Sequence, residues 1–493
     1  MSNDASVQAT SERVSAGYKP ITGRQAGLLA VIGVVCFHIA YTPAQSGLLA
    51  VAIVGYVICL VQLARLLTTR QCFYTALAVG FACFAPQLEC FWHIFGAGAI
   101  ALWLVLALWI ALFVGLTHLA LIKLGTKRAV FLVPFLWTGL EYFRSELYYL
   151  KFSWLNPGYA FGTFQPFGVF AAGFCVAAFA AVWLLPWKIA FRMTLSDLII
   201  YIILLGILAA LLLPSFAIPY GRRIRPSPLI AGVQLEFPTE REVAQSLNKI
   251  IAQQPEIKLL RFKDTTNVDL VVLPEYTLDG EPTKALKDWC RTNQKFLIVG
   301  GKDFSPGTNY YNTAFVISTN GAVVFTQAKS VPIQFFKDGE PAREQRVWES
   351  PWGKLGIAIC YDVSYRRVLD ELIRQGAQAL LIPTMDVEQW GEYEHRLNAR
   401  MARLRAAEYG VPIFRVASSG ISQLIDASGR EVATASFPGP GEIIAGELRL
   451  RTRGGSVPLD AWLAPACMVG TAIVWLGLAG SAWQNRLQTH SMA

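Results

Sequence analysis

Charged residues are scarce in this sequence: Asp, Glu, Lys and Arg make up 16% of its 493 residues, whereas hydrophobic residues make up 54%. Soluble domains usually carry about 25% charged residues, so this composition indicates an integral membrane protein. The sequence also has only five histidines and contains no Cys-x-x-Cys or His-x-x-x-His pattern. Because protein zinc sites commonly rely on such spacings, we expect no metal site.

A strong net charge is also absent. The net charge of +9 is modest for this length, and many of the basic residues lie beside apolar stretches. Basic residues in such places orient membrane spans and attract lipid surfaces, so we expect no nucleic-acid partner. The first twenty or so residues are polar, which argues against a cleavable signal peptide.

Apolar residues are unevenly distributed, and their distribution divides the chain into domains. Residues 25–220 are dominated by long uncharged stretches, residues 227–452 have the composition of ordinary globular sequence, and residues 461–483 are apolar again. We therefore expect a transmembrane domain, a soluble domain and a C-terminal transmembrane helix. Residues 1–24 and 484–493 form the two tails.

The apolar stretches predict an α-helical membrane domain with about eight spans. A transmembrane helix needs about 20 mostly apolar residues. The candidate spans are 25–42, 46–67, 72–90, 95–121, 128–143, 164–187, 197–219 and 461–483. Lysine and arginine cluster at every second connection, which predicts that these connections and both termini are cytoplasmic. Because seven spans precede the soluble segment, we expect that segment to lie outside the cytoplasm.

One connection that should be extracytoplasmic breaks the charge pattern. Residues 141–160, EYFRSELYYLKFSWLNPGYA, contain charges, aromatic residues and an Asn-Pro-Gly turn. One interpretation is an aromatic belt at the membrane surface, with Arg144 and Lys151 extended toward water. The other is an arm that helps to form a lipid-headgroup site beside the soluble domain, with Arg144 and Glu141 as candidate substrate-binding residues. The sequence favours neither.

Apolar, β-rich runs recur within the soluble segment, and helical patterns fill the gaps between them. We expect strands at 229–235, 269–275, 296–301, 313–318, 322–327, 355–360, 379–384, 412–418 and 422–426. We expect helices at 241–255, 283–293, 364–376 and 394–409. This alternation indicates an α/β domain with buried sheets and hairpins.

Three chemically distinctive residues follow apolar patterns in this segment. Glu275 follows VVLP, Lys329 follows a strand–turn–strand pattern, and Cys360 ends the run LGIAIC. Taken singly, each has a structural explanation: a helix-capping carboxylate, a solvated hairpin lysine and an inert strand cysteine. In combination they supply the nucleophile, base and cation that acyl transfer through a thioester requires.

Each of these residues has an expected chemical task. A neighbouring ammonium such as Lys329 would favour the Cys360 thiolate, since a free thiol has a pKa of about 8.5. Glu275 can take the thiol proton as general base, and Lys329 can stabilise the oxyanion of the tetrahedral intermediate. The backbone N–H of Tyr361 directly follows the nucleophile and is the expected second oxyanion donor. A thioester stores the acyl-transfer potential, so no cofactor is expected.

At these residues the segment resembles the carbon–nitrogen hydrolase (nitrilase) superfamily, whose Glu-Lys-Cys set matches LPE at Glu275, QAK at Lys329 and ICYD at Cys360. The whole chain is similar to the bacterial apolipoprotein N-acyltransferases, inner-membrane enzymes that add the third acyl chain to lipoproteins. The closer similarity is carried by WTGLEYFRSE at 137–146, FSWLNPGYA at 152–160, AGVQLEFP at 231–238 and the long stretch 388–430. The resemblance implies a nitrilase-like αββα sandwich over 227–452, on the periplasmic side of the bacterial inner membrane.

The sequence departs from the acyltransferase pattern after Lys329. The family usually shows Leu-Val-Pro-Phe-Gly-Glu there, and its glutamate is a second catalytic carboxylate, whereas this chain reads KSVPIQFFKDGEPA. Phe335 stands where that glutamate should be, and Asp338 and Glu340 are the candidate substitutes. Position 362 is also aspartate where the family generally has glutamate.

His395 and Trp390 are two further candidates for the site. His395 is the only histidine of the soluble segment and would be a rival base, but we expect it on the surface or satisfied in the core of a helix. Trp390 is expected on a mobile loop near the site, where its ring could bind an acyl chain; ordinary packing is the alternative.

These features predict a ping-pong acyl transfer. Cys360 attacks an acyl ester of a phospholipid, and the N-terminal amine of a diacylglyceryl-cysteine lipoprotein then attacks the S-acyl enzyme, in a mouth that excludes water. The alternatives are a membrane-tethered nitrilase-type amidase and a non-catalytic lipid-binding homologue. Nothing in the sequence suggests assembly, so a monomer is expected.

Overall fold

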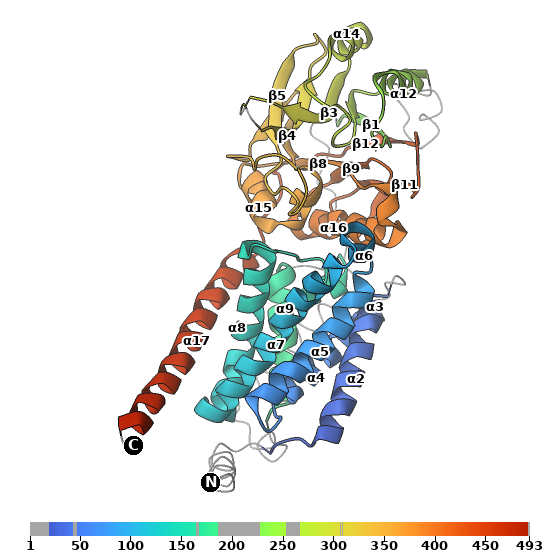
Figure 1. Ribbon diagram of the computed structural model, residues 1–493. Helices are drawn as coiled ribbons and strands as arrows, with labels where there is room; N and C mark the ends of the chain where they lie inside the picture. Colours follow the sequence, from blue (N-terminus) through green and yellow to red (C-terminus); the bar gives the residue numbers. More distant parts are fainter. Residues whose placement is uncertain are drawn as a thin grey trace. The chain divides into compact units, whose positions relative to one another are not determined.

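The computed structural model describes residues 19–42, 47–163, 167–185, 227–252, 267–305, 307 and 309–491. The chain divides into two compact units, which are described separately below. The helical unit comprises Met1–Pro214 and Pro458–Ala493, and the α/β unit comprises Ser215–Val457 (Figure 1). The expected seventh span, 197–219, lies outside the described residues.

The helical unit contains a helix at each of the other expected spans. Its α-helices are α2 (Gly23–Ala40), α3 (Gly47–Ala50), α4 (Ala52–Leu63), α5 (Thr69–Gln87), α6 (Cys90–Phe95), α7 (Gly98–Leu124), α8 (Thr126–Tyr142), α9 (Val169–Val182) and α17 (Asp460–Ser491). A π-helical turn, η1 (Phe143–Leu147), and a 3-10 turn, η2 (Pro157–Phe161), lie between α8 and α9.

Within the described residues, three helices are long and apolar enough to cross a membrane: α2, α7 and the Asp460–Gly480 part of α17. The apolar helices α4 and α9 are shorter than this requirement. The expectation of about eight spans is therefore not confirmed. Both α2 and α17 expose apolar side chains, including Leu28 at 62% and Trp462 at 78%, as surfaces that face lipid do.

Small residues allow the helices of this unit to approach closely. A Cβ on Gly80 of α5 would lie 2.8 Å from the Ala107 Cα of α7. Near the end of α8, a Cβ on Gly139 would lie 2.2 Å from the Thr471 Oγ1 of α17. Membrane helices commonly use glycine at such crossings because backbone contact replaces the hydrophobic driving force.

The α/β unit contains two six-stranded sheets. The first has the order β12–β1–β2–β3–β4–β5, and the second has the order β11–β10–β9–β8–β7–β6. The strands are β1 (Leu229–Val233), β2 (Leu270–Val272), β3 (Phe296–Asp303), β4 (Tyr311–Ile317), β5 (Val323–Ala328), β6 (Val347–Ser350), β7 (Gly353–Ile357), β8 (Ala379–Thr384), β9 (Ile413–Ala417), β10 (Ser422–Ile425), β11 (Glu431–Ala435) and β12 (Ile443–Glu447). Adjacent strands are parallel for β1–β2–β3 and β7–β8–β9 and antiparallel elsewhere.

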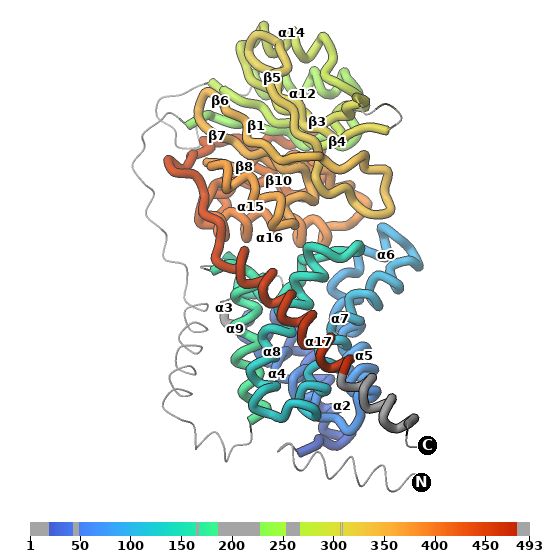
Figure 2. Tube along the Cα trace, turned by 90° about the vertical axis from the view of Figure 1, so that its left-hand side faces the viewer, coloured from blue at the N-terminus to red at the C-terminus, as the bar shows by residue number. Residues whose placement is uncertain are grey.

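The layers of this unit follow from the alternation of side chains along each strand. Ile230 of β1 packs against the second sheet, in a core shared with Leu381 and Phe414, whereas Ala231 faces α12 (Glu240–Ala252) and α14 (Lys284–Asn293). The other outer layer is formed by α15 (Arg366–Arg374) and α16 (Glu392–Tyr409) (Figures 1 and 2). The α–β–β–α sandwich expected from the resemblance is therefore present.

The strands that the sequence analysis missed are β6, β11 and β12. All three lie at sheet edges, where one side of the strand faces solvent or loops. In β11, for example, Glu431 and Val432 are exposed and only Ala435 is buried. β11 therefore lacks the continuous apolar run that identifies a buried strand, whereas β12, with Ile444, Ala445 and Gly446 buried, was missed despite its apolar sequence.

The glycine at the α5–α7 crossing can be tested by Gly80→Ala. We expect this variant to destabilise the helical unit by about 1–3 kcal/mol, because the added methyl group meets backbone rather than a mobile side chain. The measurement is the thermal midpoint in detergent. Gly115→Ala in α7 is the matched control, because a Cβ there has no atom within 4 Å; equal midpoints for the two variants would contradict the close contact.

Candidate active site

Glu275 lies just beyond the carboxyl end of β2 and is 2% exposed. The neighbouring strand β3 leaves room for it at Gly300, where a Cβ would lie 2.5 Å from the Glu275 Cα. Its Oε2 accepts a hydrogen bond of 2.8 Å from the backbone N–H of Met385, which follows β8 in the other sheet. Residues from both sheets therefore fix this carboxylate.

Lys329 follows β5 and is buried, with 1% of its surface exposed. Its Nζ lies 2.8 Å from Glu275 Oε1 and 2.7 Å from Asp338 Oδ2. Asp338 is 5% exposed and comes from the loop after β5. One ammonium thus lies between two buried carboxylates. The attraction between such buried charges offsets the loss of their hydration only when the remaining polar atoms also have hydrogen-bond partners.

Asn312 of β4 provides some of these hydrogen bonds, and the sequence analysis did not identify it. Its Nδ2 donates to Glu275 Oε1 at 2.5 Å and to Asp338 Oδ1 at 2.8 Å. Asp338 also accepts from the Tyr276 hydroxyl at 2.8 Å and from the backbone N–H of Ile333 at 2.8 Å. No local pattern distinguishes an asparagine inside a strand, so only the folded chain reveals this role.

Cys360 lies at the turn that follows β7, where a 3-10 segment, η3 (Cys360–Ser364), begins. Its φ is +50°, in the left-handed region that a side chain with a Cβ seldom adopts. The side chain is 3% exposed, and its thiol donates to the Met385 carbonyl at 3.7 Å. This strained turn at a strand end places the nucleophile candidate beside the Glu275–Lys329 pair.

Asp362 connects the cysteine turn to the lysine loop. Its carboxylate accepts from the backbone N–H groups of Ser330 at 3.1 Å, Val331 at 2.8 Å and Ile359 at 3.2 Å. Burial raises the pKa of Asp362 to about 6, although Lys329 and these N–H groups oppose the shift. The shorter aspartate therefore holds the two loops together where the family generally has glutamate.

Burial and the local charges control ionisation in this site. Burial raises the pKa of Glu275, Asp338 raises it further, and Lys329 opposes both. For Lys329, burial opposes the charged form, but Asp338 and Glu275 outweigh it and raise its pKa well above the ordinary value. Burial and then Glu275 raise the pKa of Cys360, and the opposing effect of Lys329 is smaller.

Lys329 lowers the pKa of Cys360, as expected, but burial and Glu275 outweigh it, so the local charges do not by themselves favour the thiolate. The Lys329 ammonium is shared with two carboxylates, which reduces its effect at the sulfur. Thiolate formation in this site requires a proton acceptor, and Glu275 is the adjacent carboxylate whose raised pKa suits that task.

The structure distinguishes the two carboxylates that the sequence offered in place of the family's second glutamate. Asp338 is in contact with Lys329, whereas Glu340 is exposed and accepts from Asn309 Nδ2 at 2.6 Å. Phe335, at the position of the missing glutamate, is 66% exposed. Lys329 opposes the effect of burial and lowers the pKa of Asp338, so this group is ionised at neutral pH.

Tyr361 and Trp390 lie at the margins of the site. Tyr361 is partly buried, and its ring meets that of Tyr365 edge-on at 5.0 Å. Trp390 belongs to the short 3-10 turn η4 (Glu388–Trp390), and its ring lies 6.2 Å from that of Phe336, which is 43% exposed. These contacts provide an aromatic surface near the Lys329 loop.

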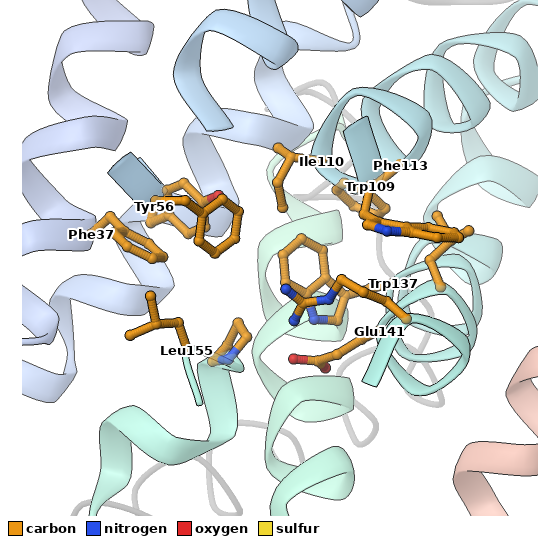
Figure 3. Close-up of a pocket in the computed structure, with 12 residues that line it drawn as sticks. Phe37, Tyr56, Trp109, Ile110, Phe113, Trp137, Glu141 and Leu155 are labelled. Atoms are coloured by element: carbon orange, nitrogen blue, oxygen red, sulfur yellow. The ribbon is translucent and has the colours of Figure 1, made fainter. Parts of the chain in front are cut away.

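Glu141 and Arg144 belong to the helical unit, where both are 5% exposed. Arg144 is buried and donates to Asn156 Oδ1, so its side chain is not extended toward water as the aromatic-belt interpretation expected. Both residues line a pocket with a largely aromatic wall (Figure 3). The pocket is lined by Phe37, Tyr56, Phe84, Trp109, Ile110, Phe113, Trp137, Leu140, Glu141, Arg144, Leu155 and Pro157.

Polar atoms around this pocket are only partly paired among the described residues. The Nη1 of Arg144 has no hydrogen-bond partner, whereas Glu141 meets the Trp137 indole and the Tyr56 hydroxyl meets the Cys83 thiol. Figure 3 shows Glu141 across the pocket from Tyr56. Unpaired buried groups of this kind cost about 1–3 kcal/mol each, more when charged, so the pocket is suited to a polar guest.

His395 is buried in α16 with 0% of its surface exposed, and its Nε2 lies 3.1 Å from the Val387 carbonyl. With Asp386 and Glu394 it forms a group whose ligand atoms lie within 4.8 Å of one another, which is close enough to hold a metal ion. Asp386, however, is already paired with the buried guanidinium of Arg415. A divalent cation would lie against that positive charge, so the chemistry of the group argues against a metal.

Comparison with known proteins places two families on this chain. Residues 229–454 match the carbon-nitrogen hydrolase family, and residues 33–181 match the apolipoprotein N-acyltransferase N-terminal domain. The first match covers the α/β unit with Glu275, Lys329 and Cys360. The second covers most of the described helices before it, including Glu141 and Arg144.

Individual relatives match either most of the chain or a shorter part of it. The apolipoprotein N-acyltransferase of Geobacter metallireducens is 24% identical over 417 residues, which is 72% of this chain and 75% of the relative. That of Pasteurella multocida is 24% identical over 70% of this chain and 74% of the relative. A deaminated glutathione amidase of Dictyostelium discoideum is 30% identical over 29% of this chain and 57% of the relative. The crystal structure of Saccharomyces cerevisiae Nit3 is 21% identical, covering 46% of this chain and 93% of Nit3, with a TM-score of 0.38.

The pairing of Asp338 with Lys329 predicts a specific acid dependence of stability. Because the pKa of Asp338 is lowered, its contribution is complete above the ordinary aspartate value of about 3.9 and is lost as the pH falls through the lower folded value. Asp338→Asn should remove this acid-dependent loss, as measured by thermal midpoints between neutral and acid pH. Glu340→Gln is the control and should keep the wild-type profile; a changed profile in that variant instead would contradict the assignment.

Proposed function

Because the chain belongs to the apolipoprotein N-acyltransferase family of the carbon–nitrogen hydrolase superfamily, we propose that it N-acylates lipoproteins. The acyl chain comes from a phospholipid, is held as a thioester on Cys360, and passes to the N-terminal amine of a diacylglyceryl-cysteine. The observation that supports this proposal most directly is the buried Glu275–Lys329–Asp338 group beside a strained cysteine turn.

The first half-reaction forms the thioester. The Cys360 proton moves to Glu275 as the sulfur attacks the ester carbonyl carbon of the phospholipid. The resulting oxyanion is stabilised by the Lys329 ammonium and the backbone N–H of Tyr361. When the intermediate collapses, the carbon–oxygen bond breaks, and the departing lysophospholipid alkoxide takes the proton from Glu275.

The second half-reaction transfers the acyl group to nitrogen. The neutral α-amine of the lipoprotein attacks the thioester carbonyl, and Glu275 takes the proton that the nitrogen loses. The same oxyanion donors act again, and the carbon–sulfur bond then breaks. Cys360 leaves as a thiolate and recovers its proton from Glu275, which restores the resting thiol. No other reactant is needed for this cycle.

Asp338 and Asn312 prepare the other groups for these steps. The charge of Asp338 keeps Lys329 protonated and raises the pKa of Glu275, as a general base working near neutral pH requires. Asn312 contacts both carboxylates and fixes their separation. Asp338 therefore takes the place of the second glutamate that the family usually has, while Glu340 has no part in the reaction.

The pocket of the helical unit is the proposed site for the phospholipid headgroup. The Arg144 guanidinium suits the phosphate, and Glu141 together with the aromatic wall suits a cationic group. The pocket is lined by Trp137, Leu140 and Glu141 from the last part of α8 and by Arg144 from η1. Trp390 is proposed to contact an acyl chain.

The apolar helices support a multi-pass location in the bacterial inner membrane. We propose that both termini are cytoplasmic and that the α/β unit lies on the periplasmic side, where lipoproteins are matured. A monomer is sufficient for the chemistry, because the catalytic residues Glu275, Lys329 and Cys360 all come from one chain.

The second candidate function is a nitrilase-type amidase, which the similarity of the α/β unit to amidases supports. The helical unit argues against it, because a soluble amide needs neither several apolar helices nor an aromatic-walled pocket among them. A non-catalytic lipid-binding role is disfavoured because the Glu275 carboxylate is hydrogen-bonded to Lys329 and to the Met385 backbone, which also contacts Cys360.

Mass spectrometry of the purified protein tests the proposed reaction. With phospholipid, Cys360 should gain an acyl-sized adduct, and a diacylated lipopeptide should discharge it as a triacylated product. Cys360→Ala should abolish both steps, and Asp338→Asn should slow them by about 10²-fold or more, since general-base catalysis is impaired. Glu340→Gln should react at the wild-type rate. Discharge to water alone would support the amidase, and the absence of an adduct would support the non-catalytic role.

The headgroup site predicts a selective effect of Arg144→Gln. We expect the KM for phospholipid to rise about tenfold or more, because a charge-assisted hydrogen bond to the phosphate is lost. The burst of nitrophenol from p-nitrophenyl butyrate, which has no headgroup, should be unchanged. Arg128→Gln, at an exposed position of the preceding helix α8, is the control. An unchanged KM for Arg144→Gln, or an equal rise for Arg128→Gln, would remove the pocket from the proposal.

A further inference from the structure

The backbone of Met385 contacts both the general-base candidate and the nucleophile candidate. Its N–H donates to Glu275 Oε2 at 2.8 Å, and its carbonyl accepts from the Cys360 thiol at 3.7 Å. A shift of this one residue would therefore move the hydrogen-bond partner of the base and that of the thiol together. What holds Met385 in place consequently bears on proton transfer between them.

Met385 begins a three-residue turn, 385–387, that follows β8. The next residue, Asp386, donates its backbone N–H to Ser418 Oγ at 3.0 Å, and its carbonyl accepts from the same hydroxyl at 2.8 Å. The carbonyl of Val387 lies 3.1 Å from His395 Nε2. Each of these backbone groups thus has a defined partner, and the partners of Asp386 and Val387 come from outside the turn.

The Asp386 side chain adds further contacts that hold the turn in place. Its Oδ1 accepts from Asn398 Nδ2 at 2.7 Å, and its Oδ2 is paired with Arg415 of β9. Asp386 and Arg415 are both 0% exposed. The pair is close-packed, since a Cβ on Gly420 would lie 2.8 Å from Asp386 Oδ2 and 2.5 Å from His395 Nδ1.

A buried ion pair is weak evidence for stability, because its desolvation cost can equal or exceed the attraction. Buried polar networks are better supported as devices that fix one conformation, which has to be shown for each protein. Here the network of Asp386, Ser418, Asn398 and Arg415 encloses the turn whose first residue contacts Glu275 and Cys360. This location relates the network to the alignment of Glu275 and Cys360 as well as to stability.

We propose that Asp386 and Ser418 are positioning residues that hold the 385–387 turn so that the Met385 backbone aligns Glu275 with the Cys360 thiol for proton transfer. The inference concerns the S-acylation step of the proposed function and does not depend on which acyl donor or acceptor is used. Neither residue contacts the reacting atoms directly; both act through the backbone of Met385.

Ser418→Ala is the sharpest test, because it removes one hydroxyl and leaves the buried charges paired. With p-nitrophenyl butyrate, we expect the pre-steady-state burst of nitrophenol to slow about tenfold, as loss of a hydrogen bond that fixes a reactive geometry would do. The ester concentration at half-maximal burst rate should be unchanged. Ser418→Thr, which keeps the hydroxyl, should recover most of the rate.

Ser350→Ala is the matched control. Ser350 Oγ also donates to a carbonyl, that of Gly353 at 2.6 Å, and accepts a backbone N–H, that of Trp352 at 3.2 Å. It lies in the β6–β7 turn, at the end of β7 opposite to Cys360. We expect a comparable change in thermal midpoint for both variants but a slowed burst only for Ser418→Ala. Equal slowing in both would overturn the proposal in favour of general destabilisation.

A double-mutant cycle with Glu275→Gln tests the route of the effect. If Ser418 acts through the alignment of Glu275, its replacement should cost little further rate once that carboxylate is gone. Additive losses would overturn the proposal. A wild-type protein that shows the burst but does not acylate a lipopeptide would refute the proposed function and leave this inference standing, whereas a wild type without a burst would refute both.

Discussion

The burial of one ammonium between two carboxylates is the constraint on which the rest of the catalytic unit depends. Lys329, Glu275 and Asp338 are almost entirely removed from water, which is favourable only if nearly every proton and lone pair has a partner. Those partners are Asn312, the Tyr276 hydroxyl and the backbone N–H groups of Ile333 and Met385. They come from both sheets and from their loops, so the sandwich has to be complete before the three charges can coexist.

The same charges determine how the nucleophile works. Burial and Glu275 raise the pKa of Cys360 against the smaller opposing effect of Lys329, so the proposed thiolate needs a proton acceptor, and Glu275 is the adjacent carboxylate. A resting thiol is also less open to oxidation than a thiolate. The turn at Cys360, with its left-handed backbone, and the carboxylate of Asp362 keep the sulfur close to the base without a continuous charge on it.

The helical unit holds its charges in a different setting. Glu141 and Arg144 lie in an apolar, aromatic surrounding, and the Nη1 of Arg144 has no hydrogen-bond partner among the described residues. A site that has to release its ligand after each turnover benefits from such incomplete pairing, since the ligand or water supplies the missing bonds.

The sequence by itself identified Glu275, Lys329 and Cys360 as the candidate catalytic residues, because their order matches the Glu-Lys-Cys set of the family that the chain resembles. It also located the helices and every strand inside the sheets. Only the tertiary structure decided between Asp338 and Glu340, brought in Asn312 and the 385–387 turn, and showed Arg144 to be buried. Those features depend on contacts between segments far apart in the chain. The edge strand β11 was missed because its exposed residues carry little periodic signal. The local sequence pattern indicates which side of a strand is buried. It does not indicate which distant residues will pack against that side.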